Sequence, residues 1–324
     1  MVARIFVTRM IPFWEEVSKP LVDAGHEVVM YPNHKPITRE EIEIEIEKGY
    51  DGLLTLLTDK IDEGLLVHDK SGQLKVIANY AVGYDNIDIE ACKKHNIKVA
   101  NTPCDEVNES VAEFTWSLML ALTRRLPEAG EFMRNAAYRG WDPDIFVGRD
   151  MMGKTLGIAG MGRIGGMVAR RAEGFGMRIE YYNRKPVEGV NYEYKARLEE
   201  LLAQSDFVSL HVPLTAETRH LINKTNLHLF KKTAVLVNTA RGPVVDEVEV
   251  GEALRAGMIA GYGADVFENE PDPHPELLLM ENVLLTPHIA SATEGARKKM
   301  GELAVLNLTE GLAGKEMPNL VRGL

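Results

Sequence analysis

The fold is decided by one stretch in the middle of the chain, Thr155-Leu156-Gly157-Ile158-Ala159-Gly160-Met161-Gly162-Arg163-Ile164-Gly165. An apolar segment of strand character runs into a G-x-G-x-x-G turn, and a helical pattern of Ile164, Met167 and Val168 follows. In such a strand–turn–helix the first glycine permits the tight turn, the second lets a pyrophosphate approach the backbone, and the third lets helix and strand pack closely. The N-terminus of the helix then offers unpaired N–H groups to the phosphates. The stretch therefore predicts a dinucleotide-binding domain.

The next expected strand, Arg178–Tyr182, is followed by Asn183-Arg184-Lys185. Dinucleotide-binding units usually carry Asp or Glu about twenty residues after the glycines, where the acid binds a ribose hydroxyl. Because an acid repels a 2′-phosphate and cations attract it, Arg184 and Lys185 favour NADP(H) over NAD(H). The alternative is a solvated basic loop, since exposed charges carry little energy.

Outward from the glycine turn, apolar strands alternate with amphipathic helices in two series. This alternation predicts an α/β fold with parallel sheets covered on both faces. The segment Glu41–Glu47 alternates like a strand, but its glutamates and its position between two strands favour a helix. The strands are expected at residues 4–7, 27–30, 53–57 and 75–78, with a helix at 14–24, and then at 155–159, 178–182, 207–210, 234–237 and 283–285.

The last helix, expected at residues 294–312, has no strand after it and can return to the first series. We therefore expect two doubly wound parallel-sheet domains, with a Rossmann cofactor domain inserted into a flavodoxin-like substrate domain. The cofactor domain would span residues 101–290, and the discontinuous substrate domain would span residues 1–100 and 291–324. A helix is expected between Glu109 and Leu122, and a loop or arm follows it around Tyr138–Pro143.

Length and composition limit the class of protein. A chain of 324 residues with 45% hydrophobic and 26% charged residues is typical of two globular domains. The net charge of −11 argues against nucleic acid as a partner, because nucleic-acid binding depends on clustered cations. No signal peptide, membrane span or zinc-site spacing is recognisable, and the only cysteines are Cys92 and Cys104. These features predict a cytoplasmic protein without a membrane partner or a metal.

Three polar residues follow apolar strands in the second series and can supply chemistry. Arg241 comes after Val237–Ala240, at the edge where open α/β sheets bind ligands, and a guanidinium there can hold a substrate carboxylate. His288 follows another strand, and an imidazole suits the protonation of an oxygen near neutral pH. Glu270 can bind the far ring nitrogen of such a histidine and fix its tautomer. Spacing alone leaves His211 as an alternative acid and Glu268 as an alternative carboxylate.

Several strings together carry a resemblance to a known family. They are Val82-Gly83-Tyr84-Asp85-Asn86-Ile87-Asp88, Gly160–Gly165, Val212-Pro213-Leu214-Thr215, Asn238-Thr239-Ala240-Arg241-Gly242, Asp265–Pro271 and Thr286-Pro287-His288-Ile289. Over essentially its full length the chain resembles the D-isomer-specific 2-hydroxyacid dehydrogenases. Within that family it looks most like the glyoxylate/hydroxypyruvate reductases. The family's usual acid is missing at Asn183, which puts NAD specificity in doubt.

The resemblance implies hydride transfer between NAD(P)H and a small 2-keto acid, giving the D-2-hydroxy acid. It selects Arg241, Glu270 and His288 as the catalytic set. It also implies a homodimer, with an arm near residues 127–152 that brings Trp141 to the neighbour's active site. The other implied cofactor contacts are Met161, Gly162, Arg163, Ile164, Val212, Pro213, Thr239, Ala240, Asp265 and Ala290, and the implied substrate contacts are Leu56, Val82, Gly83, Trp141 and Ser291.

Two alternatives to a glyoxylate/hydroxypyruvate reductase stay open at this point. D-lactate-type dehydrogenases keep the same three catalytic residues. Dimeric corepressors that sense NAD(H) share both the fold and the three residues, and they are binding proteins rather than enzymes. Fold alone does not decide between an enzyme and a binding protein.

Overall fold

The computed structural model describes residues 2–321, which form two compact units. Unit 1 comprises Met1–Val107 and Ala292–Leu324, and unit 2 comprises Asn108–Ser291. The first boundary lies seven residues later than expected from the sequence, inside helix α6 (Asp105–Thr123). No helix within residues 2–321 is both long and apolar enough to cross a membrane.

Unit 1 contains a five-stranded, all-parallel sheet in the order β2-β1-β3-β4-β5, which is the flavodoxin-like order. Its strands are β1 (Arg4–Val7), β2 (Glu27–Met30), β3 (Gly52–Thr55), β4 (Val76–Asn79) and β5 (Lys98–Ala100). Its helices are α1 (Trp14–Val17), α2 (Lys19–Asp23), α3 (Arg39–Ile46), α4 (Glu63–Leu66), α5 (Ile89–Lys94) and α12 (Glu294–Leu312).

Helix α3 confirms the helical interpretation of the alternating Glu–Ile segment. Thr38 and Glu41 form a reciprocal capping box that begins the helix. Ile42 and Ile46, four residues apart, are buried, whereas Ile44 is 60% exposed. In a strand, these three isoleucines would lie on one face and would be buried together. The observed pattern, with Ile44 exposed between two buried isoleucines, is that of a helix.

Apolar side chains fill both faces of the sheet in unit 1. One core joins α3, α4 and α5 to the strands through residues such as Leu65 and Ile77. On α12, Ala304, Val305 and Leu308 are buried, and Leu308 lies against Gly52 of β3. The C-terminal helix therefore completes the core of the N-terminal sheet, as the sequence predicted.

Unit 2 contains a seven-stranded, all-parallel sheet in the order β12-β11-β10-β9-β6-β7-β8. The order reverses between β6 and β9, which is the topological switch point of a Rossmann fold. Its strands are β6 (Thr155–Ala159), β7 (Arg178–Tyr182), β8 (Glu193–Lys195), β9 (Phe207–Leu210), β10 (Val235–Asn238), β11 (Gly261–Ala264) and β12 (Val283–Leu285). Its helices are the rest of α6, then α7 (Leu126–Arg134), α8 (Arg163–Gly174), α9 (Leu198–Gln204), α10 (Lys224–Leu227) and α11 (Glu247–Arg255), with short 3₁₀ turns η1 (Gly242–Val244) and η2 (Leu277–Leu279).

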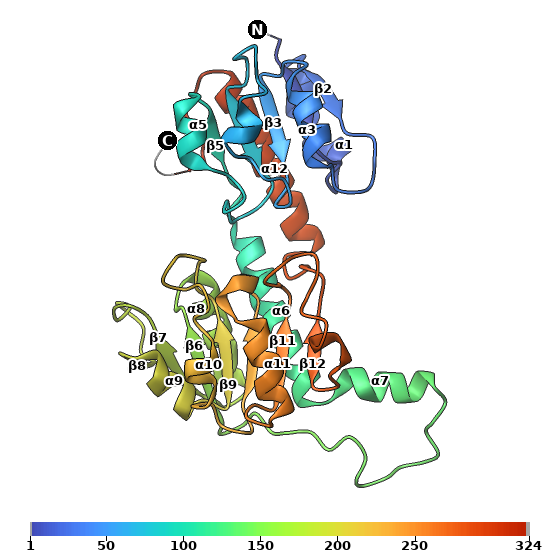
Figure 1. Ribbon diagram of the computed structural model, residues 1–324, viewed down its shortest axis with the longest axis vertical. Coiled ribbons are helices and arrows are strands. Elements are labelled where there is room, and N and C mark those ends of the chain that lie inside the picture. The colour runs from blue at the N-terminus through green and yellow to red at the C-terminus, as the bar shows by residue number, and fades with distance from the viewer. Residues whose placement is uncertain (1, 322–324) are drawn as a thin grey trace. The chain divides into compact units, whose positions relative to one another are not determined.

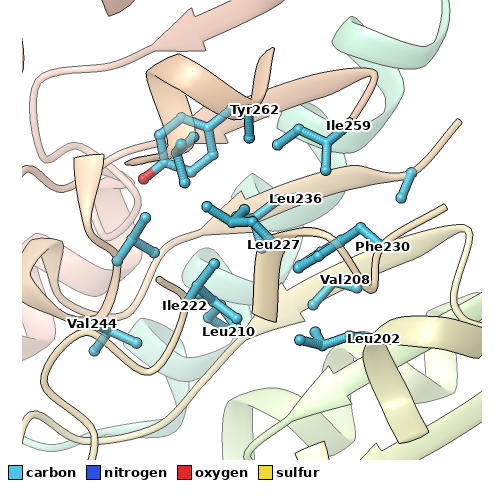
Figure 2. Packing of buried hydrophobic residues seen from close by; sticks show 14 of the residues in the cluster. Leu202, Val208, Leu210, Ile222, Leu227, Phe230, Leu236, Val244, Ile259 and Tyr262 are labelled. Atoms are coloured by element: carbon cyan, nitrogen blue, oxygen red, sulfur yellow. The ribbon is translucent and has the colours of Figure 1, made fainter. Parts of the chain in front are cut away.

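Two apolar cores lie on opposite faces of this sheet. One joins α9, α10 and α11 to the strands, with Leu202, Leu227, Leu236 and Tyr262 packed together (Figure 2). The other joins α6 and α8 to the strands and includes Trp116. Helices on both faces of parallel sheets confirm the predicted class, a doubly wound α/β protein with a Rossmann domain.

A long segment of unit 2 leaves the sheet. Helix α7 and the irregular residues 135–150 extend away from it, as Figure 1 shows. The segment exposes large apolar side chains, of which Trp141 is 84% exposed. The others are Leu126, Met133, Tyr138, Val147 and Met152. We call residues 126–152 the arm.

Some elements differ from the sequence-based expectation. The helix expected at residues 14–24 is two short helices divided at Ser18, with Pro20 in the first turn of the second. Strands β5, β8 and β11 were not expected. They have only three or four residues each, and β11 carries two glycines in Gly261-Tyr262-Gly263-Ala264, so no apolar run marks them.

Candidate active site

The glycine turn lies at the carboxyl end of β6, at the switch point. Gly160 has a φ of 102°, and a Cβ there would lie 2.6 Å from the backbone of His211 after β9. Gly162 is the N-cap residue of α8, and a Cβ on Gly165 would lie 2.2 Å from the carbonyl oxygen of Gly160. Only glycine fits the first of these positions without moving the backbone. The turn thus brings the N-terminus of a 12-residue helix to the ligand-binding edge of the sheet.

Asn183 closes this turn from the end of β7. Its Oδ1 accepts a hydrogen bond of 2.6 Å from the N–H of Met161. The side chain of Met161 is buried in the core. Arg184 and Lys185, which follow directly, are exposed. The position where an acid is usual therefore holds an amide bound to the turn, with two cations beside it in solvent.

Arg241 lies just beyond the end of β10, in extended backbone before η1. The Asn238 side chain spans this turn, accepting from the N–H of Ala240 (3.1 Å) and donating to the carbonyl of Arg241 (2.9 Å). Thr239 is buried, and its hydroxyl lies 2.8 Å from that of Thr115 on α6. The guanidinium donates to the Ala240 carbonyl (2.7 Å). The turn is held from both sides, which limits the directions that the Arg241 side chain can take.

His288 and Glu270 form a hydrogen-bonded pair. The Nδ1 atom of His288 lies 2.9 and 3.1 Å from the two carboxylate oxygens of Glu270. The two side chains are 30% and 36% exposed, so the pair lies at the surface of unit 2. With Nδ1 occupied by a carboxylate, Nε2 is the nitrogen that can pass a proton to another molecule.

The Glu270 carboxyl is held in its ionised form. Burial alone would raise its pKa, but the hydrogen bond and charge of His288 outweigh burial, together with the N–H of Phe267 (3.2 Å) and the charge of Arg241, so that the pKa is lowered. The influence of Arg241 on Glu270 links all three predicted catalytic residues electrostatically. The peptide bond Glu270–Pro271 is cis.

Asp265 fixes the backbone that carries His288. It is fully buried after β11, and its oxygens accept from the hydroxyl of Thr286 (2.6 Å) and from the N–H groups of Ile289 (2.9 Å) and Ala290 (2.6 Å). Its own carbonyl accepts from the N–H of His288 (2.9 Å). Burial raises the pKa of Asp265, and these donors oppose that rise. Because His288 adopts a φ of 54°, which is unusual outside glycine, its loop needs such an external hold.

The two alternatives that spacing left open, His211 and Glu268, have other partners in the structure. His211 lies beside the glycine turn with its Nε2 2.8 Å from the Ser209 hydroxyl, and burial lowers its pKa to about 3. Its imidazole is therefore uncharged near neutral pH, and a neutral imidazole is too weak an acid for this role. Glu268 pairs with another imidazole, that of His220, at 2.6 Å. Neither residue belongs to the Arg241, Glu270 and His288 group.

In unit 1, two loops carry the expected substrate residues Leu56, Val82 and Gly83. The carbonyls of Val82 and Gly83 accept from the side chains of Asn101 (2.6 Å) and Asn79 (3.0 Å). Since carbonyl and N–H point in opposite directions across a trans peptide, the N–H of Gly83 faces away from Asn101. Asn86 donates to the carbonyl of Leu56 (3.1 Å), which ties the two loops together.

The remaining predicted residues are placed as follows. Val212 is partly buried and Pro213 exposed, both directly after His211 at the end of β9. Ala290 is buried, with its carbonyl accepting from Ser110 on α6 (2.7 Å), and Ser291 follows it. Trp141 lies on the arm, where its side chain is 84% exposed. The supporting residues Asn238, Thr115, Ser110, Asn79 and Asn86 had no predicted role, because only tertiary contacts reveal what they hold.

The chain is similar to known proteins over nearly its whole length. The family described as D-isomer specific 2-hydroxyacid dehydrogenase, NAD binding domain, matches residues 116–290. The glyoxylate reductase of Thermococcus gammatolerans is 47% identical, across 99% of this chain and 96% of that protein.

Solved structures with the same fold are also similar over nearly the whole chain. The TT0316 protein from Thermus thermophilus is 41% identical with a TM-score of 0.92, across 98% of this chain and 99% of that one. An NADPH-dependent glyoxylate/hydroxypyruvate reductase from Sinorhizobium meliloti, solved with NADP and malonate, is 32% identical with a TM-score of 0.85, across 99% of this chain and 97% of that one.

The fold and the site define an oxidoreductase of the Rossmann type, and the chain belongs to the D-isomer specific 2-hydroxyacid dehydrogenase family. The resemblance inferred from the sequence is thereby confirmed. Within the family, the chain is similar to the glyoxylate reductases.

Proposed function

We propose that this enzyme reduces glyoxylate, hydroxypyruvate or a similarly small 2-keto acid to the D-2-hydroxy acid, with NADP(H) preferred over NAD(H). The observation that carries the proposal is the His288–Glu270 pair at 2.9 Å, with Arg241 acting electrostatically on the same carboxylate. An acid and a carboxylate-binding cation on one edge of a Rossmann sheet suit the reduction of a 2-keto acid.

The residues of the glycine turn fit a dinucleotide. Gly160 and Gly165 leave no room for a side chain, and the N-terminus of α8 lies at the same edge. Phosphates bind at such helix termini because several N–H groups lack an intrahelical partner. The exposed cations Arg184 and Lys185 support a preference for NADP(H), because they can attract a 2′-phosphate, and a relative with 32% identity is described as NADPH-dependent. When bound, the nicotinamide supplies the hydride.

The protein's own part in the reaction is binding and proton transfer. The Arg241 guanidinium binds the substrate carboxylate, and a planar donor pair suits that group. The Nε2 of His288 donates a proton to the oxygen that forms at the keto carbon, while Glu270 stabilises the protonated ring through Nδ1. For the loop at Val82 and Gly83, the resemblance supports binding of the substrate carboxylate through backbone N–H groups.

The arm supports a homodimer as the working form. Its apolar side chains, including Trp141 at 84% and Met152 at 79% exposure, are more exposed than a monomer in water favours. Covering the arm with a second copy would bury them and bring Trp141 to the partner's active site. Cys92 and Cys104 are free, which suits the reducing cytoplasm. Sedimentation of the purified protein tests the dimer, and a monomer at assay concentration would refute it.

The test of function is oxidation of NADPH and NADH with glyoxylate, hydroxypyruvate and pyruvate in parallel. The expected result is turnover with the first two acids and a higher kcat/KM with NADPH. Preference for pyruvate would indicate a D-lactate-type enzyme, and cofactor binding without any turnover would indicate a binding protein of the corepressor type.

The variant Arg241→Ala should lose turnover with every substrate. Arg255→Ala is the matched control, since this exposed arginine pairs with Glu276 on the surface and should act like the wild type. An Arg241→Ala enzyme that keeps most of its kcat/KM would exclude Arg241 from substrate binding.

A further inference from the structure

A buried carboxylate that has no part in the proposed reaction holds both ends of the loop that carries Glu270. Glu247, the first residue of α11, is 2% exposed. Its Oε1 accepts from the N–H of Glu268 (3.0 Å) and its Oε2 from the N–H of His274 (2.9 Å). Glu270 lies between these two anchor points.

Apart from the side-chain contacts of Glu268 and Glu270, the backbone of the loop has few other hydrogen bonds. Pro271 and Pro273 lie within it and have no N–H to donate. Within the loop, the N–H of Asp272 reaches the carbonyl of Asn269 (3.0 Å), which closes the turn but does not tie it to the sheet. Glu247 therefore provides the two hydrogen bonds that fix the loop to α11.

The same region also touches the turn that carries Arg241. A Cβ on Gly242 would lie 1.8 Å from the carbonyl oxygen of Phe267, so the two backbones are in direct contact. A shift of the Glu268–His274 loop would move Glu270 relative to both His288 and Arg241. Glu247 supports this arrangement from behind, out of reach of a substrate.

Burying the Glu247 carboxylate near other charges costs free energy unless it accepts the hydrogen bonds from both Glu268 and His274. Burial raises the pKa of its carboxyl, and the two N–H donors oppose that rise. The nearby titratable groups are Glu268, His274 and Tyr262, and beyond them His220 and Arg219 pair with Glu268. The partial positive charge at the N-terminus of α11 also favours the carboxylate.

We propose that Glu247 is a positioning residue that sets Glu270 against His288 by clamping the Glu268–His274 loop at both ends. This inference rests on the proposed function, since it gives Glu247 a catalytic consequence only if Glu270 and His288 act together. A residue needed for folding alone would lower the amount of active enzyme without changing how activity depends on pH.

The test compares three substitutions by the pH dependence of kcat/KM for reduction. Glu247→Gln keeps the shape of the side chain but offers only one acceptor oxygen, so one end of the loop is released. Glu270→Gln is the reference variant, because it removes the partner of His288 directly. Glu268→Gln is the matched control, since it loses the His220 pair while its backbone N–H still reaches Glu247.

For Glu247→Gln, kcat should fall at least about tenfold while the cofactor Kd changes less than about twofold. The alkaline limb of its profile should move to lower pH, toward that of Glu270→Gln, because the protonated imidazole is then less well stabilised. The Glu268→Gln profile should match the wild type. If Glu247→Gln does not fold, Glu247→Asp tests the same point, since the shorter carboxylate cannot reach both N–H groups.

A Glu247 variant with reduced kcat but a wild-type pH profile would overturn the proposal and leave Glu247 a purely structural residue. If Glu270→Gln itself leaves the profile unmoved, the proposed catalytic role of Glu270 fails instead. The two failures are therefore distinguishable in one experiment.

Discussion

Asp265→Asn should both destabilise unit 2 and slow catalysis, because the carboxylate holds three donors of the His288 loop. An amide has only one acceptor oxygen, so its NH₂ group must face at least one donor. The best orientation keeps Thr286 and Ile289 on the oxygen and leaves the N–H of Ala290, a buried residue, without a partner.

The magnitude follows from these contacts. An unpaired buried N–H costs about 1–3 kcal/mol, and two charge-assisted bonds that become neutral lose about 1 kcal/mol each. Part of this is offset, because burial raises the pKa of Asp265 and a neutral amide does not pay the cost of a buried charge. The net loss is about 2 kcal/mol, or about 4–8 °C in Tm for a unit of this size. A displacement of His288 by about 1 Å should lower kcat about 100-fold.

Thermal unfolding, steady-state kinetics and cofactor binding would be measured on the same preparation. Thr286→Val is the matched control, since it removes one donor and leaves both N–H groups on the carboxylate; its kcat should stay within several-fold of wild type. An Asp265→Asn enzyme with unchanged Tm and kcat would refute the reasoning. Weaker cofactor binding at an unchanged Tm would instead indicate that Asp265 acts by contact with the cofactor.

Two further predictions concern His211 and the basic pair. Burial lowers the pKa of His211 from 6.5 to about 3. Between pH 6.5 and about 3 the unfolded chain therefore binds a proton at this residue that the folded chain does not bind, so the stability of the fold decreases as the pH drops below 6.5. His211→Gln should remove up to about 1.4 kcal/mol per pH unit of that acid sensitivity, measured by urea unfolding at several pH values, and an unchanged slope would contradict it. Replacing Arg184 and Lys185 with serine should raise the KM for NADPH roughly 30-fold, because each exposed cation contributes about 1 kcal/mol to binding of the 2′-phosphate. The KM for NADH should stay almost unchanged. Equal effects on both cofactors would count against a 2′-phosphate site.

The sequence predicted the parts of the fold whose signals are local. Strands β1 and β2 and helix α12 were expected at the bounds observed, because turn residues or caps mark their ends. β11 was missed since its two glycines hide the apolar pattern, and β8 because Glu193 and Lys195 make it resemble a loop. The break at Ser18 was missed because the apolar pattern continues through it.

The candidate site also contains residues that sequence motifs predicted and residues that they did not. Motifs indicated Arg241, Glu270 and His288, and the structure brings Glu270 and His288 together across 18 residues of sequence. The residues that hold them have no such pattern. Glu247 is 21 and 27 residues from its two partners, and Asn238 holds its turn through side-chain contacts. Such roles depend on which distant segments meet, and spacing along the chain does not encode that.

The return of α12 to the first sheet has a consequence for synthesis on the ribosome. The N-terminal strands are made first, but the side chains that cover one of their faces, such as Leu308, arrive only after the whole of unit 2. At about 5–20 residues per second, that face would wait roughly 10–40 s for its cover. Unit 2 is continuous in sequence and can complete its core during that interval. The nascent chain should therefore bind chaperones through its first hundred residues, and a truncation just before Glu294 should leave unit 2 folded and unit 1 open to proteolysis.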